Sequence, residues 1–479
     1  MKDTDLAAKP ETAAQMSKRL GFWYLVIFGS GGLAAFYSGT AIQALAIPVF
    51  QMQLGIEPAL VGVALALPRL WDAITDPLMG NLSDNFKSRW GRRRPFVFVG
   101  AILMGLLFGL LWMVPEDWSE TGQLVWLLVG SILFFTAATI FSVPLGSLYY
   151  EATPDYDERT RVMAFGAFWN RIGEVTYQWM PWLGTVFVGL GLAAGTLGGV
   201  QIVGWLVAVI FMVIPGILAA VVGRERYAKL AAQQSRVRLW PTLRSAFTNR
   251  AFLYLVVIFI LTIFTGVLAS VMDQYLIIYY MFEGDFDQGF FWKGWISVGY
   301  GVVGLGSIPL LTLASRRFGK DATLVWVLRF VAVGVTFRLL IYQPGNQWFL
   351  FLDPVLGGGV LWTAMSMMIN SMFADICDDD ELKHGQRREG MFGAAFSYII
   401  KAGVSLTILS LGFVLSFLGF DESLGGNQSE STLKGMLVVL TAVPAVSALF
   451  CAWMLTRYPI TKEKSAETRA VLETRRGKV

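Results

Sequence analysis

Residues 58–95 read PALVGVALALPRLWDAITDPLMGNLSDNFKSRWGRRRP, an apolar segment followed by a loop with five basic residues. About 20 mainly apolar residues suffice to cross a bilayer, and a backbone in hydrocarbon must satisfy its own hydrogen bonds as a helix. Lys and Arg gather in the short cytoplasmic loops of membrane proteins. The segment therefore predicts a membrane-spanning helix that ends at the cytoplasmic face.

The whole chain has the composition of a membrane protein. Of its 479 residues, 55% are hydrophobic and 15% are charged, whereas roughly 25% of residues are charged in soluble domains. The mean hydropathy is +0.57. A single histidine, His384, and two cysteines without a CxxC motif predict no structural metal centre and no cofactor. The net charge of +4 is too small to indicate a nucleic-acid partner.

Apolar runs of spanning length recur along the chain, which predicts an all-α membrane protein with twelve transmembrane helices. The first six runs are 20–48, 58–81, 96–115, 122–147, 162–192 and 199–223. The second six are 249–281, 290–314, 321–342, 346–372, 391–420 and 433–456.

Basic residues alternate between the loops. Lys and Arg cluster in segments 82–95, 224–250, 315–320 and 373–389, whereas segments 49–57, 116–121 and 193–198 have none. Because basic loops stay in the cytoplasm, both termini are expected there, in a plasma membrane of the bacterial inner-membrane type.

The basic linker divides the chain into two halves of six spans. A weak echo supports this division, because Ser88-Arg-Trp-Gly-Arg92 after the second span is similar to Ser315-Arg-Arg-Phe-Gly-Lys320 after the eighth. Two six-helix halves around a midplane site are the architecture of the major facilitator superfamily. The predicted parts are an N-terminal tail (1–19), a first bundle (20–223), a linker (224–248), a second bundle (249–456) and an exposed charged tail (457–479).

Three charged residues share one face of the second span. Arg69, Asp72 and Asp76 are spaced i, i+3 and i+7. At 1.5 Å per residue, Asp72 lies roughly 20 Å along the helix, inside the hydrocarbon. Acids at that depth usually face a cavity and act on ions, either as oxygen ligands of Na⁺ or as proton carriers. The alternative is that Arg69 neutralises one acid in a structural pair.

Three sequence motifs resemble the glycoside–pentoside–hexuronide:cation symporter family, to which the melibiose permease belongs. The motifs are Arg-Leu-Trp-Asp72-Ala-Ile-Thr-Asp76-Pro, Ala374-Asp375-Ile-Cys-Asp378 with Gly385-Gln-Arg-Arg388-Glu-Gly390, and Tyr-Ile-Ile-Lys401-Ala-Gly. The resemblance implies that Asp72 and Asp76 bind the coupling Na⁺, Li⁺ or H⁺ and that Lys401 is a counter-charge beside them. Arg69, on the same face of the second span as the two acids, is a second candidate counter-charge. A lysine that reaches the membrane interface is the alternative for Lys401.

The chain departs from the melibiose permease in the expected sugar site. The first span has no acid, and Ser142 and Gly146 stand in the fourth span where the permease has an acid and a tryptophan. The permease's sugar-binding arginine aligns near Ala167. A galactoside therefore does not follow from the resemblance, and Na⁺ and H⁺ both remain open as the coupling ion.

Other polar and aromatic side chains at membrane depth are candidates for binding the solute. They are Ser142, Asn170, Arg171, Glu174, Asp273, Trp362 and Tyr398. Arg171 and Glu174 could instead form a structural ion pair, Asp273 could mark a membrane boundary, and the aromatic residues could face lipid.

Charged residues near the cytoplasmic ends of the spans are candidates for a gate that locks the two halves in one state. They are Asp84, Arg92, Arg93, Arg94, Asp375, Asp378 and Arg388, with segment 155–161 as a partner loop. The positive-inside bias alone would also explain the arginines.

The sequence thus predicts a monomeric secondary transporter, surrounded by lipid, that couples a glycoside or related polar solute to a cation by alternating access. An uncoupled facilitator or exporter of an amphipathic molecule is the alternative. An enzyme would need a nucleophile with its base, or metal ligands, at membrane depth, and the sequence offers neither.

Overall fold

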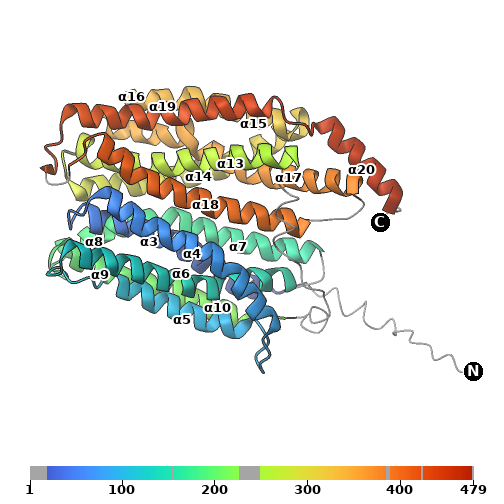
Figure 1. The fold of residues 1–479 in the computed structure, drawn as a ribbon, viewed down its shortest axis with the longest axis horizontal. Helices are drawn as coiled ribbons and strands as arrows, with labels where there is room; N and C mark the ends of the chain where they lie inside the picture. Colours follow the sequence, from blue (N-terminus) through green and yellow to red (C-terminus); the bar gives the residue numbers. More distant parts are fainter. Residues whose placement is uncertain (1–18, 153–155, 226–248, 385–388, 422–423, 477–479) are drawn as a thin grey trace, which may run out of the picture.

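The computed structural model describes residues 19–152, 156–225, 249–384, 389–421 and 424–476. The predicted N-terminal tail and most of the predicted linker lie outside these residues. Figure 1 shows two groups of helices that run roughly parallel along the long axis, the first half of the chain beneath the second.

Helices of the first half begin and end close to the predicted apolar runs. They are α2 (Phe22–Gly29), α3 (Gly31–Ala46), η1 (Ile47–Gln51), α4 (Pro58–Asn85), α5 (Arg94–Leu111), α6 (Glu120–Glu151), α7 (Tyr156–Thr176), η2 (Tyr177–Trp179), α8 (Met180–Gly189), α9 (Gly195–Val207), η3 (Ala208–Val213) and α10 (Ile214–Val222).

The second half repeats this pattern and adds one helix at the C-terminal end. Its elements are α13 (Arg250–Tyr275), η4 (Leu276–Met281), α14 (Phe286–Phe318), α15 (Lys320–Gly334), η5 (Val335–Phe337), α16 (Arg338–Ile341), η6 (Gln347–Leu352), η7 (Pro354–Gly358), α17 (Gly359–His384), α18 (Glu389–Phe417), α19 (Glu430–Leu455) and α20 (Lys462–Arg476).

The predicted all-helical membrane fold is confirmed. Within the described ranges, eleven helical segments are long and apolar enough to cross a membrane. The remaining predicted span corresponds to α7, η2 and α8, which a 3₁₀ turn interrupts. Its first part carries Arg171 and Glu174, so its low hydropathy reflects polar side chains inside the bundle.

The two halves meet along two seams, α4 against α18 and α7 against α14. Glycine allows the first seam to close, because a Cβ atom at Gly412 of α18 would lie 2.4 Å from the Pro58 carbonyl oxygen of α4. At the end of the molecule opposite the termini, Thr185 donates to Asp287 at 2.6 Å and Tyr275 donates to Gln51. These hydrogen bonds join the halves on that side.

The C-terminal segment makes a contact that the sequence did not indicate. Residues 457–479 were expected to be an exposed charged tail, and most described side chains of α20 are exposed, but the helix also packs against α17. Leu472 is 4% exposed, and Ser465 donates to Asp375 of α17 at 2.9 Å. Lys462 donates to the Arg316 carbonyl at 2.8 Å, which ties α20 to the end of α14. The charges of α20 concealed the few residues by which it docks.

Candidate functional site: a carboxylate pair and a polar cavity

The acids of the second span meet a lysine from the other half of the molecule. The Lys401 ammonium of α18 lies 3.0 Å from Asp72 Oδ2 and also forms an ion pair with Asp76 Oδ2. The Asp72 side chain is 11% exposed, whereas those of Asp76 and Lys401 are each 26% exposed. One ammonium thus bridges two carboxylates across the α4–α18 seam, at a site that solvent still reaches.

A hydroxyl group from the fourth span completes this cluster. Thr139 Oγ1 of α6 lies 2.5 Å from Asp72 Oδ1 and 3.0 Å from Asp76 Oδ1. The sequence did not indicate Thr139, because a threonine is tolerated in any apolar helix. The one feature of the sequence that could have indicated Thr139 is its position one turn before Ser142, in the span where the melibiose permease carries an acid. Asp72, Asp76 and Thr139 together present a set of hard oxygen atoms, which suits a small cation.

Arg69 does not pair with either acid among the described residues. Its guanidinium donates to the Gly39 carbonyl and lies 4.2 Å from the centre of the Phe135 ring. Within the part of the chain that the structure describes, there is thus no direct Arg69–Asp ion pair, and the counter-charge in contact with both acids is Lys401. A role for Arg69 as a longer-range counter-charge stays a prediction.

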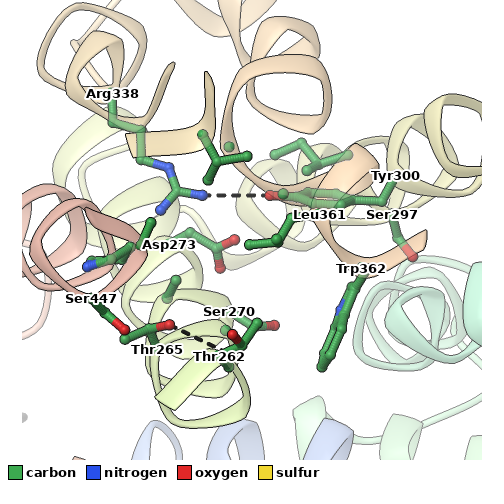
Figure 2. A pocket seen from close by; sticks show the side chains of 18 of the residues that line it. Thr262, Thr265, Ser270, Asp273, Ser297, Tyr300, Arg338, Leu361, Trp362 and Ser447 are labelled. Carbon is green, nitrogen blue, oxygen red and sulfur yellow. Dashed lines mark hydrogen bonds between the residues drawn. The ribbon is translucent and has the colours of Figure 1, made fainter. Parts of the chain in front are cut away.

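A cavity with a mostly apolar wall and several charged and hydroxyl groups lies mainly in the second half, between α13, α14, α17 and α19, with η2 and the end of α7 at its edge (Figure 2). Two nearly buried residues on its wall, Asp273 of α13 and Lys293 of α14, form an ion pair. Lys293 also donates to the Ser270 carbonyl at 2.9 Å. Asp273 therefore lies on a cavity wall, which is one of its two sequence interpretations.

A second buried charge cluster lies where two spans of this half are broken. Arg338 follows the 3₁₀ turn η5, and Asp353 stands between η6 and η7. Arg338 Nε lies 2.6 Å from Asp353 Oδ1, and Tyr300 donates to Asp353 Oδ2 at 2.7 Å. Figure 2 shows the Arg338 guanidinium directed at the Tyr300 hydroxyl.

Glycine makes room for this second cluster. A Cβ atom at Gly357 would lie 2.6 Å from an Arg338 nitrogen and 2.7 Å from an Asp353 oxygen. The sequence offered little sign of the pair, because Arg338 is near the end of one apolar run and Asp353 near the start of the next. Each reads as a boundary residue until the fold brings them together.

The predicted solute-binding residues fall into two groups. Arg171 and Glu174 form an ion pair at 2.5 Å within α7, and Glu174 lies on the cavity wall, whereas a role of this pair in binding the solute stays a prediction. Trp362 lines the cavity and is 40% exposed. In contrast, Ser142 and Asn170 are not part of the cavity wall. The Tyr398 side chain lies outside the described residues.

The arginines predicted as gate residues are held by a carboxylate of their own half. The Glu225 carboxylate accepts hydrogen bonds from the backbone N–H groups of Arg92, Arg93 and Arg94, at 2.8, 2.9 and 2.9 Å. The Arg94 side chain donates to the carbonyls of Ala220 and Val221. Glu225 thus caps the start of α5, a role that the sequence did not suggest.

The other gate candidates have contacts inside the second half or are not described. Asp375 forms an ion pair with Lys320 at 2.5 Å, and Asp378 is half-buried on α17. The Asp84 side chain, Arg388 and the start of the partner loop at 155 lie outside the described residues. A lock between the two halves therefore stays a prediction.

Comparison with known proteins gives matches over nearly the whole chain. Residues 27–462 match the family described as "MFS/sugar transport protein". "Uncharacterized symporter sll1374" of Synechocystis sp. is 24% identical, over 88% of this chain and 91% of that protein. "Putative glycoside/cation symporter YagG" of Escherichia coli is 23% identical over 91% of both chains. "Sodium-dependent lysophosphatidylcholine symporter 1" of Homo sapiens is 24% identical, over 88% of this chain and 80% of that protein.

Solved structures show the same fold at low sequence identity. A bacterial homologue of the human lysosomal transporter Spinster, in an inward-facing and unoccupied conformation, has a TM-score of 0.61 at 13% identity, covering 94% of this chain and 97% of that one. The nucleoside transporter NupG has a TM-score of 0.56 at 14% identity, covering 91% of this chain and 97% of that one. The likeness confirms the predicted major facilitator fold.

Proposed function

We propose that this chain, which belongs to the MFS/sugar transport protein family, couples a cation to the uptake of a glycoside or related polar solute. Membership of the family makes it a multi-pass membrane transporter and not an enzyme. The membrane is proposed to be the bacterial inner membrane, with both termini in the cytoplasm and the monomer as the working unit. The names of relatives as symporters support the coupling.

The observation that carries this proposal is the ammonium of Lys401 between Asp72 and Asp76. A cation is already held at the two carboxylates, but it is a side chain from the opposite half. A free Na⁺ that takes its place would keep the charge balanced and would release the tie between α4 and α18. Cation binding would thereby change the relative stability of the carrier's conformations, as coupling requires.

Na⁺ is favoured over H⁺ by the third member of the cluster. The Thr139 hydroxyl can contribute an oxygen ligand to a metal ion, whereas it has no part in carrying a proton on a carboxylate.

The proposed solute site lies on the other seam. Glu174 of α7 and the second-half residues of the cavity meet where α7 packs against α14. Cation and solute would thus act on the same rocking motion at separate seams. Each must bind more tightly when the other is present, because the coupling free energy is reciprocal.

The test is solute uptake by the purified protein in liposomes, driven by an inward Na⁺ or H⁺ gradient. Asp76→Asn is expected to abolish uphill uptake, while downhill exchange of the same solute persists. Glu57→Gln is the matched control, since Glu57 is exposed at the start of the same helix. Full uphill uptake by Asp76→Asn would refute the coupling role, and a response to H⁺ alone would refute the preference for Na⁺.

A further inference from the structure

We infer that the cavity of the second half binds the neutral, polyhydroxylated part of the solute and discriminates against a solute that carries a net charge, such as a uronide. This inference rests on the proposed transport function and narrows its substrate class. It follows from three features of the cavity wall: its charge balance, its unused hydrogen-bonding capacity and its exposed aromatic ring.

The first feature is charge balance. Each charged side chain on the wall has an opposite charge as its partner: Asp273 with Lys293, Arg338 with Asp353, and Glu174 with Arg171. The described charges that line or back the cavity therefore sum to zero. A carboxylate that entered would either stay without a counter-charge or take Lys293 or Arg338 from an acid, which would leave that acid buried and unpaired. Either outcome is costly in a site that excludes most water.

The second feature is the hydrogen-bonding capacity that remains. A lysine ammonium has three donors, and Lys293 uses one for Asp273 and one for the Ser270 carbonyl. Thr262 and Thr265 donate to the carbonyls of Ile258 and Leu261 in their own helix, so their oxygens remain available as acceptors. These donors and acceptors on the cavity wall suit solute hydroxyls, which can both give and accept hydrogen bonds, and no ion pair has to open.

The third feature is an aromatic wall. Trp362 of α17 is 40% exposed although it lies inside the bundle, and Figure 2 places it across from Ser270 and Thr262. An exposed indole face provides an apolar surface beside the polar groups, which is the combination that ligand pockets use to orient a compact polar ring.

A zwitterionic lipid headgroup is also neutral overall, but it would bind differently. Its cationic and anionic groups are held apart by covalent bonds, so both could be paired only if the contact between Asp273 and Lys293 opened. A polyol can form hydrogen bonds while the ion pairs stay intact, whereas a zwitterion gains ion-pair partners only when Asp273 and Lys293 separate. The balanced cavity therefore favours the polyol.

The experiment compares ligands that differ in one group. Binding of aryl β-glucoside and of the matching aryl β-glucuronide, in which a carboxylate replaces the hydroxymethyl group, is measured by calorimetry on the purified full-length protein in saturating Na⁺. The same panel includes the galactoside, the xyloside and lysophosphatidylcholine. We expect a neutral glycoside to bind at least about tenfold more tightly than its uronide.

Three variants test the charge argument itself. Asp273→Asn leaves Lys293 without its counter-charge and is expected to shift the glucuronide-to-glucoside affinity ratio toward the uronide by about tenfold or more. The double variant Asp273→Asn/Lys293→Gln is neutral again and should regain the original preference. Lys293→Gln alone should weaken uronide binding further.

A second measurement keeps this inference separate from the proposed function. The Na⁺-induced rise in melting temperature reports on the cation site at the other seam, and it should persist in all three variants if they are folded. Any one of four results would overturn the inference. The unmodified protein could bind the uronide as tightly as the glycoside or more tightly, bind lysophosphatidylcholine most tightly, or bind no neutral glycoside. The fourth result is an unchanged glucuronide-to-glucoside affinity ratio in Asp273→Asn. Loss of the Na⁺ effect in the unmodified protein would instead contradict the proposed function.

Discussion

Replacing Lys401 with methionine should make the protein bind Na⁺ more tightly. The Lys401 ammonium contacts both Asp72 and Asp76. An incoming Na⁺ must displace it, so part of the intrinsic binding free energy is spent on breaking these contacts. Methionine has a similar length but no charge, and it leaves the two carboxylates open to the ion.

The size of the effect follows from the burial of the pair. Removing one partner of a fully buried ion pair costs about 3–5 kcal/mol. Lys401 and Asp76 are each 26% exposed, so water compensates part of that loss. We therefore expect roughly half of it, about 1.5–2.5 kcal/mol, which corresponds to a roughly tenfold to seventyfold lower Kd for Na⁺.

The assay is a Na⁺ titration of the purified protein followed by its melting temperature and by tryptophan fluorescence. Mildly alkaline buffer limits competition from protons, which the unpaired acids of the variant would attract more strongly. In buffer without Na⁺, Lys401→Met should also have a lower melting temperature than the unmodified protein. Addition of Na⁺ should restore the melting temperature of the variant. Unchanged or weaker Na⁺ affinity would refute the idea that Lys401 occupies the site in competition with the ion.

Three further predictions concern the neighbouring contacts. Thr139→Val should raise the Kd for Na⁺ by about tenfold, or about 1.4 kcal/mol, because it removes one oxygen ligand without changing side-chain volume much. An unchanged Kd in the same titration would exclude Thr139 as a ligand. Glu225→Gln should lower the free energy of unfolding by about 1–2 kcal/mol, because the charged acceptor for three consecutive N–H groups at and just before the start of α5 becomes neutral. An unchanged melting temperature would argue against the cap. Asp375→Asn should weaken the packing of α20, because the hydrogen bond that Asp375 accepts from Ser465 becomes weaker. The variant should be cleaved faster than the unmodified protein in the segment before α20 during limited proteolysis. An unchanged cleavage rate would contradict this prediction.

Much of the fold could be predicted because hydropathy acts locally. A segment of about 20 apolar residues becomes a helix in the bilayer whatever its neighbours are, so the predicted runs match the observed helices to within several residues in most cases. Asp72, Asp76 and Lys401 were also visible from sequence, since charges inside apolar runs are costly and therefore conspicuous.

The missing parts depend on contacts between distant segments. Thr139 carries no charge and blends into an apolar helix, so only its contact with both acids reveals it. Arg338 and Asp353 sit at breaks in two spans, where the sequence suggests a membrane boundary. Similarly, α20 reads as a solvated tail because the residues by which it docks, among them Leu472, are few among many charges. In each case the function of the residue depends on a contact with a distant segment, and the sequence does not show which segment that is.

Equilibrium binding of radioactive Na⁺ to the purified protein tests the cation site most directly. We predict saturable binding by the unmodified protein and by Glu57→Gln, and loss of that binding in both Asp72→Asn and Asp76→Asn. Saturable binding of undiminished affinity in the two aspartate variants would contradict the assignment of the ion to these carboxylates.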